Sequence, residues 1–249
     1  MQKLTLPVNN CGVTCGYKNQ NYRNYWGFGH YGVDYVSDSL VLYALGTGEV
    51  LMKGWDNLFG NIIIIKYPEV YNHATGEVKD LICRMYHMAS ESPCEVGYQV
   101  SRGESIGIMG TTGQYSSGVH VHVEFDTDTK YYNYGVPLAK DSNLIKKGVD
   151  STVDPSDILY VGSNQRVYNN SLAGWATDKE LNLPVLDEEP ETSKDPEMSE
   201  ELKKQLDELE SRVSKNEKDI AELYTGMAKN DEFRENMLKA MEAVINGSN

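Results

Sequence analysis

Positive charge is scarce in this chain of 249 residues, where 23 lysines and arginines stand against 37 aspartates and glutamates and the formal net charge is −14. A protein that binds the phosphate backbone of nucleic acid needs clustered Lys and Arg, so this balance argues against a nucleic-acid partner. The acidity is also uneven. From Leu186 onward there are 18 acidic and 9 basic residues, whereas the preceding part carries a charge of only −5.

An apolar segment that would direct or anchor the chain in a membrane is missing. The opening MQKLTLPVNN is too polar to act as a signal segment. We therefore expect synthesis in the cytoplasm without a signal peptide, and no membrane insertion.

Cysteine is limited to four residues, which permit three pairings if all are oxidised. Cys83 and Cys94 flank His87, so a bridge between them would brace the loop that carries this histidine. Cys11 and Cys15 would staple the amino-terminal arm. The alternative is four reduced thiols, which the absence of a signal segment slightly favours. Neither pair has CxxC spacing, so we do not expect a second zinc site.

Phenylalanine is rare as well, with 4 residues against 17 tyrosines. Many of the tyrosines fall in two groups, between Tyr17 and Tyr35 and between Tyr131 and Tyr134. One interpretation is that they line a polar groove for a peptide or a sugar polymer. The other is that they occupy half-buried strand positions, as aromatic residues often do.

Histidine is the scarce residue that carries the chemistry, because four of the five histidines fall in three short patches. His120 and His122 lie in GTTGQYSSGVHVHVEF, where alternation predicts a strand, and residues two apart on a strand share a face. His30 stands four residues before Asp34 in GHYGVDY, and His87 lies in RMYHMAS. A catalytic zinc site takes three such ligands and leaves a fourth position open, so this set can also supply two histidines for proton chemistry.

The local structure around His30 has two interpretations. An i,i+4 pair with Asp34 can lie on one face of a helix. Gly29 and Gly32 bracket the histidine, and Val33 and the β-branched and aromatic residues after it favour a loop that enters a strand.

Over roughly its first 160 residues the chain resembles the lysostaphin-type or LytM-like zinc endopeptidases that cut bacterial peptidoglycan. His30-Tyr31-Gly32-Val33-Asp34 matches the family's HxGxD motif, and Met85-Tyr86-His87-Met88 matches its histidine patch. The third match is a long glycine-rich segment that runs through Gly97, Val100, Gly103, Ile106, Gly107, Gly110, Thr112, Gly113, Gly118, His120, His122 and Glu124. An ordered set of this kind is far more specific than any one motif.

The resemblance implies that His30, Asp34 and His122 hold one zinc ion per chain, while His87 and His120 act on the substrate. Such an ion makes water nucleophilic near neutral pH and polarises the scissile carbonyl. His120 is then placed to orient or deprotonate the water, and His87 to stabilise the oxyanion or protonate the leaving amine. These two roles can also be exchanged or shared.

The chain departs from the family at two places. Val121 and Val123 take the apolar positions of the usual HLHFE motif, which preserves the strand alternation. The family's early arginine has no clear counterpart in CGYKNQNYR, where Lys18 or Arg23 would have to take its place. The departures concern polar contacts near the zinc rather than the five site positions.

The pattern of short strand-like runs and turns predicts a mainly β fold with an antiparallel sheet, with strands over Leu40–Leu45, Gly60–Ile65, Leu81–Tyr86 and Val119–Phe125. Residues 62–65 form a continuous apolar run, typical of a strand buried on both faces. We place the LytM/lysostaphin-type metallopeptidase domain at residues 1–162. An acidic linker follows over 163–196, and its last part, residues 186–196, has the composition of a solvated segment.

Residues 197–246 are predicted to form an α-helical coiled coil. Apolar residues, with one asparagine, recur there at alternating spacings of four and three, at Leu202, Leu206, Leu209, Val213, Asn216, Ile220, Leu223 and Met227. We expect a homo-oligomer through this segment. The alternative is one amphipathic helix packed on its own domain.

Together these observations favour a hydrolase, a zinc metalloendopeptidase whose partner is bacterial peptidoglycan. The alternative is a non-catalytic wall-binding or virion-structural protein that retains the fold. A wall-cutting domain joined to a coiled coil without a signal segment suggests a bacteriophage endolysin or a tail-associated protein, which acts on the cell wall from the virion or after lysis. A bacterial protein exported by another route would show the same features.

Overall fold

The computed structural model of the chain describes residues 1–130, 132, 149–168, 182–186 and 204. The chain divides into two compact units, Met1–Leu202 and Lys203–Asn249. The first unit holds all but one of the described residues.

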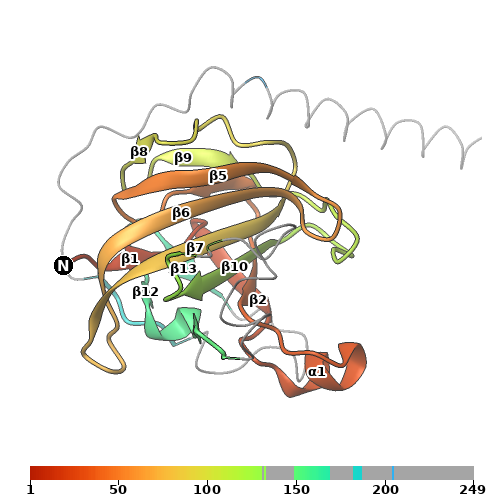
Figure 1. Cartoon of the computed structure of the whole chain (residues 1–249), viewed down its shortest axis with the longest axis horizontal. Helices are drawn as coiled ribbons and strands as arrows, with labels where there is room; N and C mark the ends of the chain where they lie inside the picture. The colour runs from red at the N-terminus through yellow and green to blue at the C-terminus, as the bar shows by residue number, and fades with distance from the viewer. Residues whose placement is uncertain (131, 133–148, 169–181, 187–203, 205–249) are drawn as a thin grey trace, which may run out of the picture. The chain divides into compact units, whose positions relative to one another are not determined.

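Strands dominate this unit (Figure 1). In chain order they are β1 (Leu4–Thr5), β2 (Asn10–Cys15), β3 (Val33–Val36), β4 (Val41–Tyr43), β5 (Gly48–Asp56), β6 (Gly60–Tyr71), β7 (Val78–Met88), β8 (Gln99–Val100), β9 (Ser105–Ile108), β10 (Val121–Asp126), β11 (Thr152–Val153), β12 (Leu159–Tyr160) and β13 (Arg166–Val167). The described residues of this unit also form two short helices, α1 (Gln20–Trp26) and the 3₁₀ turn η2 (Pro155–Asp157). The predicted mainly β fold is therefore confirmed. Within the described ranges, no helix is long and apolar enough to cross a membrane.

Within the described residues the main sheet has nine strands, in the order β13-β2-β3-β10-β7-β6-β5-β8 with β11 on β10. Every pair in it is antiparallel except β13 with β2. Its long strands β5, β6 and β7 lie side by side in Figure 1. Because the order is not that of the chain, β3, β10 and β7 become neighbours although they are far apart in sequence.

The sheet is apolar on both faces near its centre. On β6, Ile63 and Ile65 belong to the main core, whereas Ile62 and Ile64 belong to a smaller cluster with Ile82 and Tyr86. Each of the four β6 isoleucines is at most 1% exposed. The prediction that the run 62–65 is buried on both faces is thus confirmed. Strand β10 instead alternates, with its three apolar residues in the main core and its polar residues on the opposite face.

Helix α1 was not predicted. Asn19 begins it, because the side-chain Oδ1 accepts the Tyr22 backbone N–H at 3.0 Å, and Gly27 ends it in the left-handed conformation at φ 81°. None of its residues is buried. The helix therefore lacks the buried apolar stripe by which helices are recognised in a sequence. Only its two capping residues, Asn19 and Gly27, indicate it.

Ordered structure continues beyond Gly162, where the domain boundary was placed. Arg166–Val167 form β13 against β2, and Leu183 is buried in the main core. The segment that we assigned to a linker thus contributes to the edge of the sheet. Residues 169–181 and 187–196 of the linker and, apart from Lys204, the coiled-coil segment lie outside the described residues, so the coiled coil stays a prediction.

Candidate metal centre

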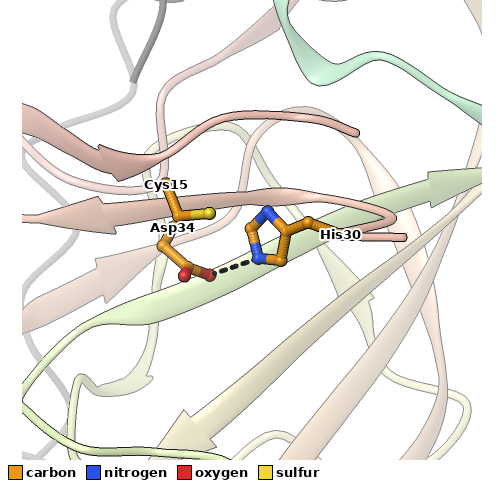
Figure 2. A group of neighbouring side chains, drawn as sticks. All are labelled: Cys15, His30 and Asp34. Atoms are coloured by element: carbon orange, nitrogen blue, oxygen red, sulfur yellow. Dashed lines mark hydrogen bonds and ion pairs between the residues drawn. The ribbon is translucent and has the colours of Figure 1, made fainter. Parts of the chain in front are cut away.

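The sheet brings three predicted ligands to one point. His30 lies in the loop before β3, Asp34 lies on β3, and His122 is the register partner of Asp34 on β10. Asp34 Oδ1 is 3.1 Å from His30 Nε2 and 2.9 Å from His122 Nδ1. The two ring nitrogens are themselves 3.1 Å apart. Figure 2 shows His30 and Asp34 turned toward one another from adjacent backbone segments.

This triangle of donor atoms fits zinc. With bonds of about 2.0–2.1 Å, the edges of a tetrahedral zinc site are about 3.3 Å long. The observed edges of 2.9–3.1 Å are only slightly shorter. Two imidazoles and one carboxylate are also a ligand set that zinc accepts, and three ligands leave a position open. His30 donates its other ring N–H to the Gly16 carbonyl at 2.9 Å, which directs Nε2 toward the centre.

The surroundings of Gly32 explain why the motif HYGVD has a glycine at this position. A Cβ at this position would lie 2.7 Å from His122 Nε2 and would also collide with the carbonyl oxygen of Val123. Any side chain here would therefore push the His122 ring away from Asp34. The glycine allows β3 and β10 to approach closely enough for the ligands to converge.

The electrostatics of the centre favour bound positive charge. Burial opposes ionisation of Asp34, but His30, His122 and His120 hold its pKa well below the usual value. Burial likewise opposes a charge on His122, but Asp34 and Glu124 raise its pKa to about 9. The carboxylate is thus ionised at neutral pH and attracts a cation to the same point.

A buried ion cluster lies behind His122. Arg84 on β7 is the register partner of Glu124 on β10, and their side chains pair at 2.6 Å. Arg84 also pairs with Asp126 at 2.9 Å. Glu124 Oε2 in turn lies 3.7 Å from His122 Nε2, on the side of the ring that faces away from Asp34. A carboxylate in this place favours the tautomer with Nδ1 free for a metal.

His87 and His120 stand beside the centre with defined tautomers. His87 Nδ1 is 2.8 Å from the Thr112 carbonyl, and His120 Nδ1 is 2.8 Å from the Gly118 carbonyl. Because a carbonyl only accepts, both Nδ1 atoms carry a hydrogen, so in the neutral ring Nε2 is the atom that can accept a proton. The two rings are 4.8 Å apart, and His120 Nε2 is 3.8 Å from Asp34 Oδ1.

The backbone of His87, which we assign to proton transfer, has an uncommon conformation. Its φ of 66° lies in the left-handed region, at the end of β7 opposite an irregularity in β6. Backbone strain of this kind is often found at functional sites. Burial, and next the neighbouring His120, lower the pKa of His87 to about 4, so its ring is neutral and can accept a proton at neutral pH.

Cys15 was not predicted to be near the metal. It is the register partner of Asp34 on β2, and its Sγ lies within 4.8 Å of donor atoms of both His30 and Asp34 (Figure 2). All four cysteines are free and buried. A thiolate is also a zinc ligand, so two overlapping donor sets exist, one completed by His122 and one by Cys15.

Because His122 Nδ1 lies 2.9 Å from Asp34 Oδ1 and 3.1 Å from His30 Nε2, we predict His122 rather than Cys15 as the third ligand. The variant Cys15→Ser is therefore expected to keep about one zinc per chain, and its cobalt form should have the same absorption spectrum as that of the unaltered chain. Metal content and the cobalt spectrum would be measured on both proteins. A sulfur-to-cobalt charge-transfer band that disappears in Cys15→Ser would instead identify the thiolate as a ligand.

Aromatic side chains surround the centre. Tyr22 on α1 lies 4.6 Å from the His30 ring and 5.7 Å from Phe28, which is 6.0 Å from Tyr115. Trp26 on the same helix is 6.2 Å from Tyr115. Phe28, Tyr115 and Trp26 are exposed, so the rings are accessible to a ligand. The predicted tyrosine-lined groove stays a prediction, and Tyr131 and Tyr134 lie outside the described residues.

Comparison with known families supports a peptidase domain here. Residues 28–134, less than half of the chain, match the model of Peptidase family M23. This match covers His30, Asp34, His87, His120 and His122 and supports a LytM/lysostaphin-like Peptidase M23 domain within the chain.

The solved structures that the chain is similar to include a zinc-containing peptidase from Vibrio cholerae, at 23% identity over 50% of this chain and 36% of that chain, with a TM-score of 0.41. Lysostaphin from Staphylococcus simulans matches at 23% identity over 62% of this chain and 52% of that chain, with a TM-score of 0.43. The chain thus spans about a third to a half of the length of these two proteins. The catalytic domain of lysostaphin matches at 24% identity over 59% and 89% of the two chains, with a TM-score of 0.39.

Proposed function

We propose that this chain is a zinc-dependent endopeptidase that hydrolyses peptide cross-links of bacterial cell-wall peptidoglycan. The observation that carries the proposal is the convergence of His30, Asp34 and His122 within 3.1 Å of one another. His87 and His120 stand beside them, and each directs its Nδ1 to a backbone carbonyl, which leaves Nε2 for proton transfer. A module that only binds the wall has no chemical need for these two additional histidines.

The two additional histidines divide the proton transfers of hydrolysis between them. A zinc ion at the centre supplies Lewis-acid chemistry, which polarises a carbonyl and makes water nucleophilic near neutral pH. His120 Nε2, next to Asp34, accepts the proton of the attacking water. The His87 ring lies 4.8 Å from the His120 ring. His87 Nε2 receives the proton from His120 and donates it to the leaving amine. Burial and, next, the neighbouring His120 lower the pKa of His87, so His87 gives up a proton readily.

Metal removal tests the proposal directly. The purified chain is expected to contain about one zinc and to release new amino termini from purified peptidoglycan. A chelator should stop this release, and added zinc should restore it, because no other group in the proposed mechanism polarises the carbonyl. Walls from several bacterial types would be compared, with zinc content measured on the same samples.

Each other result has a definite meaning. Zinc without cleavage of any wall would favour the alternative of a wall-binding or virion-structural protein. A chain that binds no zinc would overturn the site itself. Cleavage that persists in chelator would leave the enzyme but contradict the role of the metal.

We also propose that the segment 197–246 makes the protein oligomeric and attaches it to a larger assembly, such as a phage tail that penetrates the wall. Its heptad pattern is the support for this proposal. A free phage lysin that acts at lysis would use the same catalytic domain, and a virion-associated protein would differ only in its attachment.

A further inference from the structure

A pocket of about 390 Å³ lies next to the metal centre. Among the residues that line it are Lys18, Arg23, Phe28, Tyr31 and Asp150. Gly29 and Tyr31, the chain neighbours of ligand His30, both line it. The backbone N–H of Lys18 also donates to the His30 carbonyl at 2.6 Å. A group bound in the pocket would therefore belong to the same substrate as the bond held at the centre.

The charges in the pocket are not balanced. Lys18 forms an ion pair with Asp150, and its ammonium also lies 4.8 Å from the centre of the Tyr17 ring. Arg23, in contrast, has no hydrogen bond or ion pair through its guanidinium with any residue that the structure describes. One positive charge is thus left over among the described residues of the pocket, in a chain whose net charge is −14.

The shape of the Arg23 side chain indicates what it would bind. A guanidinium presents a planar fork of donors that matches the two oxygens of a carboxylate. Phe28 and Tyr31 add ring surface beside it, suited to the carbon skeleton that bears the acid. Lys18, Arg23 and Asp150 all lie outside residues 28–134, so the charged side of the pocket comes from parts of this chain that the family model does not include, whereas Phe28, Gly29 and Tyr31 lie within it.

We propose that this pocket binds a carboxylate of the wall peptide through Arg23 and thereby selects which cross-linked peptide is cleaved. The inference rests on the proposed endopeptidase function. Wall peptides carry such groups in two places, at the free end of a stem peptide and on the α-carbon of a γ-linked glutamate. Both present the same carboxylate chemistry, and substrates in which each group is blocked in turn distinguish them.

The test uses four synthetic cross-linked peptides, in which the terminal carboxyl and the glutamate carboxyl are each free or amidated. Hydrolysis by the full zinc-loaded chain is expected to show a kcat/KM about 10- to 100-fold higher for one free carboxylate over its amide, the range for a hydrogen bond to a charged group. Arg23→Gln should reduce this preference to near unity, and Arg23→Lys, which keeps the charge but not the fork, should give an intermediate value. Arg166→Gln, at an exposed arginine of β13 outside the pocket, is the matched control and should retain the full preference.

Equal kcat/KM for all four peptides, or a preference that survives in Arg23→Gln, would overturn the pocket assignment while leaving the endopeptidase intact. If no peptide is cleaved, the proposed function fails, and the pocket is then judged by binding alone. Fluorescence anisotropy with the same labelled peptides should still show tighter binding of a free carboxylate that depends on Arg23. Binding that ignores both the carboxylate and Arg23 would reject the pocket independently.

Discussion

Replacing His122 by alanine is expected to abolish both zinc binding and hydrolysis, whereas replacing His120 should leave zinc bound and reduce turnover. His122 Nδ1 completes the donor triangle at 2.9 Å from Asp34 and 3.1 Å from His30. Its loss leaves two ligands, so zinc affinity should fall by more than the roughly 10–100-fold typical of losing an outer partner. His120 makes no such contact, and loss of a general base typically costs about 10²–10⁴-fold in rate.

The two variants form a matched pair, because the residues are two positions apart and both substitutions remove an imidazole. Zinc content per folded chain would be measured together with kcat/KM on a soluble wall fragment. Circular dichroism would establish that each variant keeps its β structure. Equal loss of zinc in both variants would show that the ligands have been assigned incorrectly, and full turnover in His120→Ala would remove it from the proton pathway.

The parts of the site that the sequence predicted are those whose chemistry is visible in single residues. His30, Asp34 and His122 are types that zinc prefers, and HxH on a strand places both rings on one face. The β6 strand was predictable for a similar reason, since four successive buried isoleucines need apolar surroundings on both faces. In each case the information lies within a few positions of the chain.

What the sequence did not reveal depends on which strands are neighbours. Cys15 reaches the metal centre only because β2 pairs with β3 and places it opposite Asp34. Arg84 would be expected at the surface, yet it is fully buried because β7 pairs with β10 and brings Glu124 opposite it. The sheet order β2-β3-β10-β7 does not follow the order of the strands in the chain, so no local sequence pattern predicts these contacts. Helix α1 was missed for a different reason, because none of its residues is buried.

The buried position of Arg84 leads to the second large expected effect, a loss of about 3–5 kcal/mol in the free energy of unfolding for Arg84→Met. The guanidinium is 0% exposed and pairs with two carboxylates that are themselves 1–4% exposed. Its Nε–H also donates to the Tyr132 carbonyl at 2.6 Å. Without it, Glu124 and Asp126 remain buried in the interior and lose the cation that pairs with both. Urea unfolding would measure the loss.

Lys79→Met is the matched control, because Lys79 lies on the same strand and pairs with Glu77 at 2.8 Å but is 53% exposed. A surface pair of this kind contributes only about 0–1 kcal/mol. The triple variant Arg84→Met, Glu124→Gln, Asp126→Asn should recover part of the lost stability, since it also removes the uncompensated charges. It should not recover zinc affinity, because His122 then lacks the carboxylate beyond its Nε2. If Arg84→Met were no more destabilising than Lys79→Met, the ion cluster would have to be accessible to water. The proposal that the buried cluster holds His122 in place would then be wrong.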